Sequence, residues 1–230
     1  MTTDIEDERF AALRQKMVNA QLRARGIRDQ RVLAAMGKVP RHLFVDEEYR
    51  DSAYEDHPVP IGAGQTVSQP YIVAFMLEVL SLDGSERVLE IGTGSGYLTA
   101  LLAELARQVY SVERIGSLSQ AAESALQRLG YTNVSLKVGD GSTGWADHAP
   151  FDAIVVSAAA PEVPKALLEQ LREAGRMIIP VGPAEAQELK LVRKERGRAV
   201  VTNLEACRFV PLIGQEGYRE GWQPQSRRRS

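Results

Sequence analysis

The sequence predicts an α/β protein built on a doubly wound, mostly parallel β-sheet. Apolar strand-like runs alternate with helix-like segments between Arg87 and Val181, and a glycine-rich turn follows the first of these strands. Such alternation is typical of a parallel sheet covered by helices. The chain has 230 residues, of which 44% are hydrophobic and 25% charged, so it is long enough for one well-buried globular domain.

Residues 1–82 are predicted to form a helical segment and an active-site loop that pack on the core. Apolar residues recur at helical spacing over 10–18 and again over 32–36, and Gly37 and Pro40 are expected to end the second helix. The segment is completed by a loop rich in Gly, Pro, Ser and Gln over 56–70 and an apolar helix over 71–80, with Pro70 in its first turn.

Residues 83–213 are predicted to form the core. The expected strands are Arg87–Ile91, Gln108–Val112, Val134–Val138, Asp152–Ser157 and Arg176–Val181. The expected helices between them are Tyr97–Ala106, Ser117–Leu129 and Pro164–Glu173, the last with Gly175 as its C-cap. Two further strand-like runs within 188–212 flank a charged turn and predict an antiparallel hairpin at the sheet edge. Residues 214–230 are predicted to form a C-terminal tail. The chain as a whole is predicted to form one structural domain.

Charge and composition exclude several classes of partner. The formal net charge of −2 gives no general basic field for nucleic acid, and the basic run 227–229 is expected to be solvated. No apolar run approaches the length of a membrane span, and the acidic start lacks the apolar stretch of a signal peptide, so a cytoplasmic protein is expected. Cys207, the single cysteine, fits a reducing compartment and is expected to be a buried, inert thiol. His42, His57 and His148 lack the spacing of metal ligands, and no metal is expected.

The glycine-rich turn indicates a ligand site. Gly92, Gly94 and Gly96 have the spacing G-x-G-x-G after the first strand, and the carboxyl ends of parallel strands are where open α/β sheets bind ligands. Glu113 ends the next strand, 21 positions after Gly92, which suits an acid that accepts hydrogen bonds from ribose hydroxyls. Asp140 follows the third strand and adds a polar group at the same edge.

The acidic residue of the pattern favours one cofactor. Glu90 opens an E-x-G-x-G-x-G motif, whereas a dinucleotide site binds a pyrophosphate and avoids extra negative charge. S-adenosylmethionine carries a sulfonium, an ammonium and a ribose, so this pattern favours it over NAD. A tight strand-to-helix turn without a ligand is the alternative. There is no phosphate-binding loop with Lys, and Ser95 lacks the frame of a nucleophile elbow.

Seven stretches together resemble the protein-L-isoaspartate O-methyltransferase family. They are "GQTVSQPYIVAFM" (64–76), "VLEIGTGSGY" (88–97), "VYSVER" (109–114), "GDG" (139–141), "FDAIVVSAAAPEVP" (151–164), "GRMIIPVG" (175–182) and "RFVPL" (208–212). The resemblance runs from about Phe10 to Leu212. The glycine motif is shared by many methyltransferases, but "GQTVSQP" is specific to this family; Val67 stands where isoleucine is commoner.

The resemblance implies methyl transfer from S-adenosyl-L-methionine to the free α-carboxyl of L-isoaspartyl residues in damaged proteins and peptides. The ester then closes to a succinimide, whose hydrolysis returns some aspartate. The implied fold is that of class I S-adenosylmethionine-dependent methyltransferases: a seven-stranded sheet with an N-terminal helical addition and a C-terminal antiparallel hairpin, the last two strands exchanging places relative to other methyltransferases. The expected partners are isoaspartyl-containing proteins and peptides, and the expected oligomeric state is a monomer.

The resemblance also implies the site residues. Ser68 would be catalytic and would bind the acceptor carboxylate, and Pro211 and Leu212 would border the peptide groove. Glu113 would hold the ribose, Asp140 and Gly141 would sit by the adenine, and Glu90 would lie near the methionine end. The full implied cofactor site is Thr66, Val67, Gln69, Glu90, Gly92, Thr93, Gly94, Ser95, Gly96, Glu113, Arg114, Asp140 and Gly141. For Ser68, the alternative is a helix N-cap.

The absence of an obvious general base agrees with this acceptor. A carboxylic acid of this kind is ionised at neutral pH, so it needs only alignment and removal of water. Three alternatives stay open: another S-adenosylmethionine-dependent methyltransferase that acts on a small molecule or on nucleic acid, a non-catalytic adaptor that binds isoaspartyl sites, and a dehydrogenase. The intact "GQTVSQP" and glycines argue against the adaptor.

Overall fold

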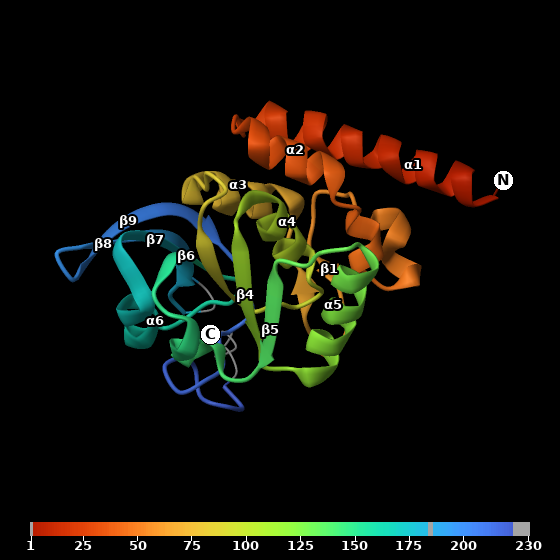
Figure 1. Cartoon of the computed structure of the whole chain (residues 1–230). Coiled ribbons are helices and arrows are strands. Elements are labelled where there is room, and N and C mark those ends of the chain that lie inside the picture. The colour runs from red at the N-terminus through yellow and green to blue at the C-terminus, as the bar shows by residue number, and fades with distance from the viewer. Residues whose placement is uncertain (1, 184–185, 223–230) are drawn as a thin grey trace, which may run out of the picture.

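A seven-stranded, mostly parallel sheet forms the centre of the molecule (Figure 1). The computed structural model describes residues 2–183 and 186–222, with side chains from residue 8. The strand order is β5-β4-β3-β6-β7-β8-β9; β8 pairs antiparallel with both β7 and β9, and all the other pairs are parallel. The strands are β3 Arg87–Ile91, β4 Gln108–Glu113, β5 Val134–Val138, β6 Phe151–Val156, β7 Leu171–Val181, β8 Gln187–Glu195 and β9 Arg198–Cys207. The expected α/β fold and its terminal hairpin are confirmed.

The strand order creates a switch point at β3. The chain proceeds from β3 to β4 and β5 on one side and then crosses to β6 on the other side, with β3 parallel to both neighbours. A crevice therefore opens beyond the carboxyl ends of β3 and β6, which is where open α/β sheets bind their ligands. The glycine turn leaves β3 at this crevice.

Helices cover the two faces of the sheet unequally. The helices are α1 Thr2–Met17, α2 Gln30–Lys38, α3 Pro70–Leu80, α4 Tyr97–Leu105, α5 Gly116–Arg128 and α6 Lys165–Gln170. One core cluster joins α3, α4 and α5 to Val88 of β3 and Val109 of β4, while a second joins α6 to Leu89 and Ile91 on the opposite face. In Figure 1, α1 and α2 form an outer layer over α3 and α4.

Two details of the N-terminal segment differ from expectation. Helix α2 ends at Lys38, so Gly37 lies inside it; at its start, the Asp29 carboxylate accepts hydrogen bonds from the backbone of Arg31 and Val32. The loop 56–70 contains a short antiparallel ladder between β1 Val59–Pro60 and β2 Thr66–Val67. This pairing fixes the loop as a hairpin beside the sheet.

The helix expected over Pro164–Glu173 is too long, and Gly175 is not its C-cap. Helix α6 ends at Gln170, and β7 begins at Leu171, five residues before the expected start. Leu171 is fully buried and pairs with Phe151, which is also fully buried, across a register shift in β6. Burial of this side chain in the core outweighs the helical pattern of the local sequence.

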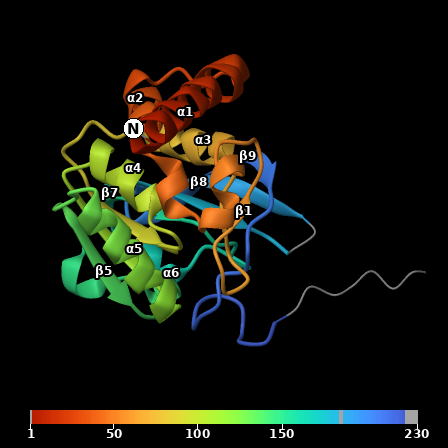
Figure 2. The ribbon, with the colours of Figure 1, turned by 90° about the vertical axis from the view of Figure 1, so that its right-hand side faces the viewer.

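The chain after β9 returns beneath the sheet, at the end opposite α1 and α2 (Figure 2). There the Tyr218 hydroxyl donates to the Gly182 carbonyl over 2.8 Å. The last two strands follow chain order, with β8 inside and β9 at the edge. The basic run 227–229 lies outside the described residues, and the division of the chain at 82/83 and 213/214 stays a prediction.

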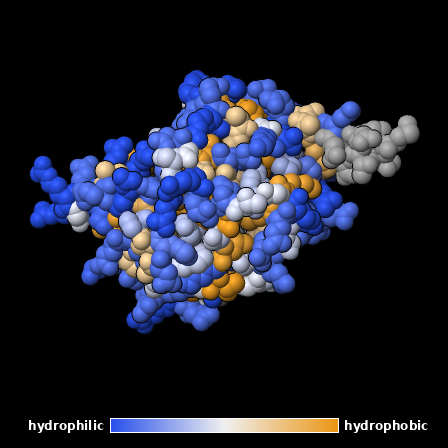
Figure 3. Space-filling model, viewed as in Figure 1, coloured by the Kyte–Doolittle hydropathy of each residue, from blue (hydrophilic) through white to orange (hydrophobic). Residues whose placement is uncertain are grey.

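The exposed surface is largely polar. The face in Figure 3 is dominated by hydrophilic residues, with hydrophobic residues in small groups between them. In the described part of the chain, no helix combines the length and the apolar character that crossing a membrane requires.

Candidate active site

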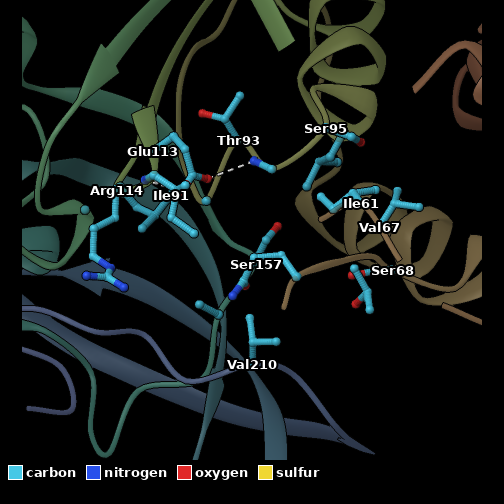
Figure 4. A pocket seen from close by; sticks show the side chains of 18 of the residues that line it. Ile61, Val67, Ser68, Ile91, Thr93, Ser95, Glu113, Arg114, Ser157 and Val210 are labelled. Atoms are coloured by element: carbon cyan, nitrogen blue, oxygen red, sulfur yellow. Dashed lines mark hydrogen bonds between the residues drawn. The ribbon is translucent and has the colours of Figure 1, made fainter. Parts of the chain in front are cut away.

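A pocket opens at the switch point, and segments far apart in the sequence line it (Figure 4). The glycine turn 92–95 and residues 113–115 at the end of β4 form one side. The hairpin residues 65–68, the end of β6 at 157–158 and the segment 210–213 form the others. The pocket therefore gathers the predicted cofactor turn and the predicted acceptor loop around one space.

The glycine turn presents bare backbone to the pocket. Gly92 and Gly94 have φ of 92° and 53°, a left-handed conformation that L side chains rarely adopt. A Cβ on Gly94 would lie 3.3 Å from Cδ1 of Ile61. Thr93 and Ser95 line the pocket, but Gly96 does not: a Cβ there would meet Ala122 of α5 at 3.1 Å. Gly96 lets α4 and α5 approach each other, and its expected contact with the cofactor stays a prediction.

Glu113 offers its carboxylate at the edge of the pocket. Its Oε2 accepts a hydrogen bond from the backbone of Gly94 and its Oε1 from that of Ile115, both at 2.9 Å, and the residue is 7% exposed. Each carboxylate oxygen keeps a further lone pair, which suits two neighbouring hydroxyls. Arg114 also lines the pocket, with its guanidinium 3.3 Å from Glu220.

Glu90 does not reach the pocket, contrary to expectation. The pleat of β3 directs its side chain to the face covered by α4, where Oε2 accepts hydrogen bonds from the hydroxyls of Thr99 and Ser111, both at 2.6 Å. The residue is fully buried, and this burial raises the pKa of Glu90 to about 8. In this structure Glu90 is a core residue that joins β3 to α4 and β4 through these two hydrogen bonds.

The raised pKa of Glu90 predicts a loss of stability as pH rises. The folded-state pKa lies above the unfolded value of about 4.3, so the contribution is complete below pH ~4 and disappears as pH rises through about 8. Between these values the free energy of unfolding should fall by up to about 1.4 kcal/mol per pH unit. Glu90→Gln should flatten this decline in denaturant titrations, whereas Glu123→Gln, on the exposed surface of α5, should not. Parallel curves for wild type and Glu90→Gln would contradict the assignment.

Ser68 faces the pocket with a free hydroxyl, and the structure rules out the N-cap alternative. The N-cap of α3 is Gln69, and no side chain caps that helix. Among the described residues, none hydrogen-bonds the Ser68 hydroxyl. The Ser68 carbonyl accepts from Nη2 of Arg41 at 2.8 Å, and Nε of Arg41 donates to the Ala53 carbonyl at 2.6 Å. The fully buried Arg41 thus ties the acceptor loop to the N-terminal segment.

Asp140 and Gln69 also lie outside this pocket, against expectation. The Asp140 carboxylate accepts from the backbone and hydroxyl of Ser142 and from the backbone of Gln215, so it anchors the C-terminal segment. Only its neighbour Gly141 lines the pocket. Gln69 donates to Asp56 and faces a second hollow.

The second hollow, here called the groove, runs from the pocket between the start of α3 and the end of β9. It is lined by Arg25, Pro58, Thr66, Ser68, Gln69, Tyr71, Ile72, Ser157, Glu205, Ala206, Cys207, Arg208, Phe209 and Val210. Pro211 and Leu212, expected to border a peptide groove, line the first pocket instead. Burial raises the pKa of the Cys207 thiol to about 11, so it stays protonated at neutral pH.

Sequence reasoning missed several lining residues. Ile61 and Val210 come from irregular segments whose approach only the tertiary structure fixes. Ser157, by contrast, directly follows β6, so the rule that ligands bind beyond strand ends pointed to it. Among the described residues, no cluster of His, Cys, Asp or Glu could hold a metal ion.

The residues present fit an adenosyl cofactor that lacks phosphates. The lining combines the Glu113 carboxylate with bare glycine backbone and with Ile91, Val112, Ile115 and Leu212, apolar neighbours suited to an adenine ring. The fold and this site define a class I S-adenosylmethionine-dependent methyltransferase.

The comparisons with known proteins define the family. Residues 13–217 match the family model described as protein-L-isoaspartate(D-aspartate) O-methyltransferase. The chain belongs to this family. Curated relatives named protein-L-isoaspartate O-methyltransferase include one from Koribacter versatilis, 56% identical over 91% of this chain and 94% of its own length. A second relative, protein-L-isoaspartate O-methyltransferase 1 from Syntrophobacter fumaroxidans, is 54% identical over 91% of this chain and 98% of its own length.

Solved structures of members of the same family have the same fold as this chain. A protein-L-isoaspartate O-methyltransferase superposes with a TM-score of 0.81 at 31% identity, covering 89% of this chain and 67% of that one. A beta-aspartate methyltransferase from Plasmodium falciparum, in complex with S-adenosyl-L-homocysteine, superposes with a TM-score of 0.76 at 28% identity, covering 87% of this chain and 98% of that one.

Proposed function

We propose that this chain transfers a methyl group from S-adenosyl-L-methionine to the free α-carboxyl of L-isoaspartyl residues in damaged proteins and peptides, which starts their repair through a succinimide. The observation that carries the proposal is the meeting of two spaces at Ser68: a pocket suited to an adenosyl cofactor and a groove open to the surface. Membership of the family and the names of its members support it. We also propose that the enzyme is cytoplasmic and monomeric.

The cofactor supplies, when bound, an electrophilic methyl group whose carbon–sulfur bond breaks as an acceptor oxygen attacks. In the proposal, Glu113 accepts hydrogen bonds from the ribose hydroxyls. Gly92 and Gly94 let the backbone approach, and Thr66, Val67, Thr93, Ser95, Arg114 and Gly141 complete the lining. Apolar side chains such as Val67, which is 7% exposed, exclude water from the weakly nucleophilic carboxylate.

The acceptor needs orientation rather than a base. Its α-carboxyl is ionised at neutral pH, so the nucleophile arrives deprotonated and no proton is transferred. The Ser68 hydroxyl donates to one carboxylate oxygen and directs the other at the methyl carbon. Among the described residues that line the pocket, none is histidine or lysine, the side chains that would otherwise act as bases near neutrality.

Methyl transfer to paired peptides tests this function. Two peptides that differ only in aspartyl or isoaspartyl linkage should be labelled very differently, with essentially all incorporation in the isoaspartyl form. The product should be base-labile, as expected for a methyl ester. Equal labelling of the two peptides would contradict the substrate, while labelling of neither would contradict the activity.

A further inference from the structure

The pocket and the groove share four lining residues, Thr66, Ser68, Ser157 and Val210. An acceptor group that enters along the groove and meets the methyl donor in the pocket must pass between them. Ser68 comes from the hairpin before α3, whereas Ser157 comes from the end of β6, on the other side of the space (Figure 4). Two serine hydroxyls therefore flank the junction between the pocket and the groove.

Ser157 is positioned rigidly by the sheet. Its backbone N–H donates to the Ile91 carbonyl over 2.8 Å, which continues the ladder between β3 and β6 by one residue. A Cβ on Gly92 would lie 3.5 Å from the Ser157 Cβ, so the serine stands directly beside the glycine turn. It is half-buried, and no described residue hydrogen-bonds its hydroxyl. A half-buried hydroxyl without a protein partner is available to a ligand.

We propose that Ser157 is a second donor to the acceptor carboxylate: its hydroxyl binds one carboxylate oxygen from the sheet side while Ser68 binds from the hairpin side. This inference rests on the proposed function. A carboxylate has two oxygens and about four lone-pair positions, so it can accept both hydroxyls and keep a lone pair for the methyl carbon. Two donors on opposite sides fix the carboxylate plane, which a single donor leaves free to rotate.

The proposal makes Ser157 selective for a charged acceptor. Hydrogen bonds to ionised groups are roughly twice as strong as those between neutral groups. An isoaspartyl peptide should therefore lose more affinity in Ser157→Ala than the same peptide with its α-carboxyl converted to a carboxamide. The cofactor should lose none, because the hydroxyl faces the acceptor.

The test compares wild type, Ser157→Ala, Ser157→Thr and Ser124→Ala. Ser124 lies on the exposed surface of α5 and serves as the matched serine control. Calorimetry with S-adenosyl-L-homocysteine present measures the dissociation constants of the carboxylate and carboxamide peptides. In Ser157→Ala, the carboxylate affinity and the kcat/KM for methyl transfer should each fall about tenfold or more, and the preference for carboxylate over carboxamide should shrink. Ser157→Thr, which keeps the hydroxyl, should retain the preference, and melting temperatures should match.

Two results would overturn the proposal. One is an unchanged carboxylate preference and kcat/KM in Ser157→Ala. The other is weaker cofactor binding with an unchanged peptide preference, which would place the hydroxyl on the cofactor. Failure of the proposed function itself is distinguishable, because wild type would then not discriminate between isoaspartyl and aspartyl peptides in the first place.

Discussion

Glu113→Ala should weaken the binding of S-adenosyl-L-methionine by about a hundredfold or more. The ribose hydroxyls lose a charged acceptor, and hydrogen bonds to charged groups contribute about 1.5–3 kcal/mol each. The same carboxylate orders the glycine turn through the backbone of Gly94, so its loss also loosens the cradle that the cofactor enters. Calorimetric titration with the cofactor measures the effect.

Two variants control this measurement. Glu113→Gln keeps one acceptor oxygen and should bind with intermediate affinity. Glu162→Ala, at an exposed position after β6, should bind as wild type does. If Glu113→Ala binds the cofactor with an unchanged dissociation constant, Glu113 is not the ribose ligand, and the cofactor lies elsewhere in the pocket.

Ser68→Ala should slow methyl transfer by about ten- to hundredfold and leave cofactor binding nearly intact. The variant loses one hydrogen bond to a charged acceptor, worth about 1.5–3 kcal/mol in the transition state. Since the Ser68 hydroxyl has no partner among the described residues and Gln69 occupies the N-cap, the melting temperature should hardly change. Single-turnover rates with an isoaspartyl peptide, S-adenosyl-L-methionine titration and thermal melts on the same protein measure the three quantities.

Ser68→Thr distinguishes the effect of the hydroxyl group from the effect of side-chain size. Threonine keeps the donor but crowds the carboxylate, so its rate should fall between those of wild type and Ser68→Ala. A Ser68→Ala enzyme with an undiminished single-turnover rate would remove Ser68 from the catalytic residues. A large drop in the melting temperature of Ser68→Ala would instead show that Ser68 has a structural role. No such role is expected, because no described residue hydrogen-bonds the Ser68 hydroxyl.

Local patterns determined most of the core. Strands β3 and β5 have the bounds that the sequence predicts: β3 is a short, largely apolar run before the glycine turn, and β5 alternates apolar and polar residues, as a strand pattern requires. The glycine turn was also readable, since Gly92 and Gly94 need a backbone conformation that few other residues tolerate. The family resemblance, carried by several motifs together, indicated the cofactor and the acceptor.

The structure departs from the expected picture where a side chain's direction or burial depends on distant segments. Helix α6 ends early because Leu171 joins Phe151 in the core, and no local pattern contains that partner. Asp140 follows a strand as expected, but the returning C-terminal segment occupies its carboxylate through Gln215. A strand end alone does not decide whether a polar group meets a ligand or another part of the chain.

The sequence by itself determined the α/β class, the strand that carries the glycine turn, and the acid at the end of the next strand. Only the tertiary structure decided which polar groups share a space. Glu90 precedes Gly92 by two positions, yet the pleat of β3 points it into the core, whereas Ser157, more than sixty residues along the chain, stands beside Gly92. The reason is physical: alternation along a strand separates near neighbours onto opposite faces, and parallel pairing brings the ends of distant strands together.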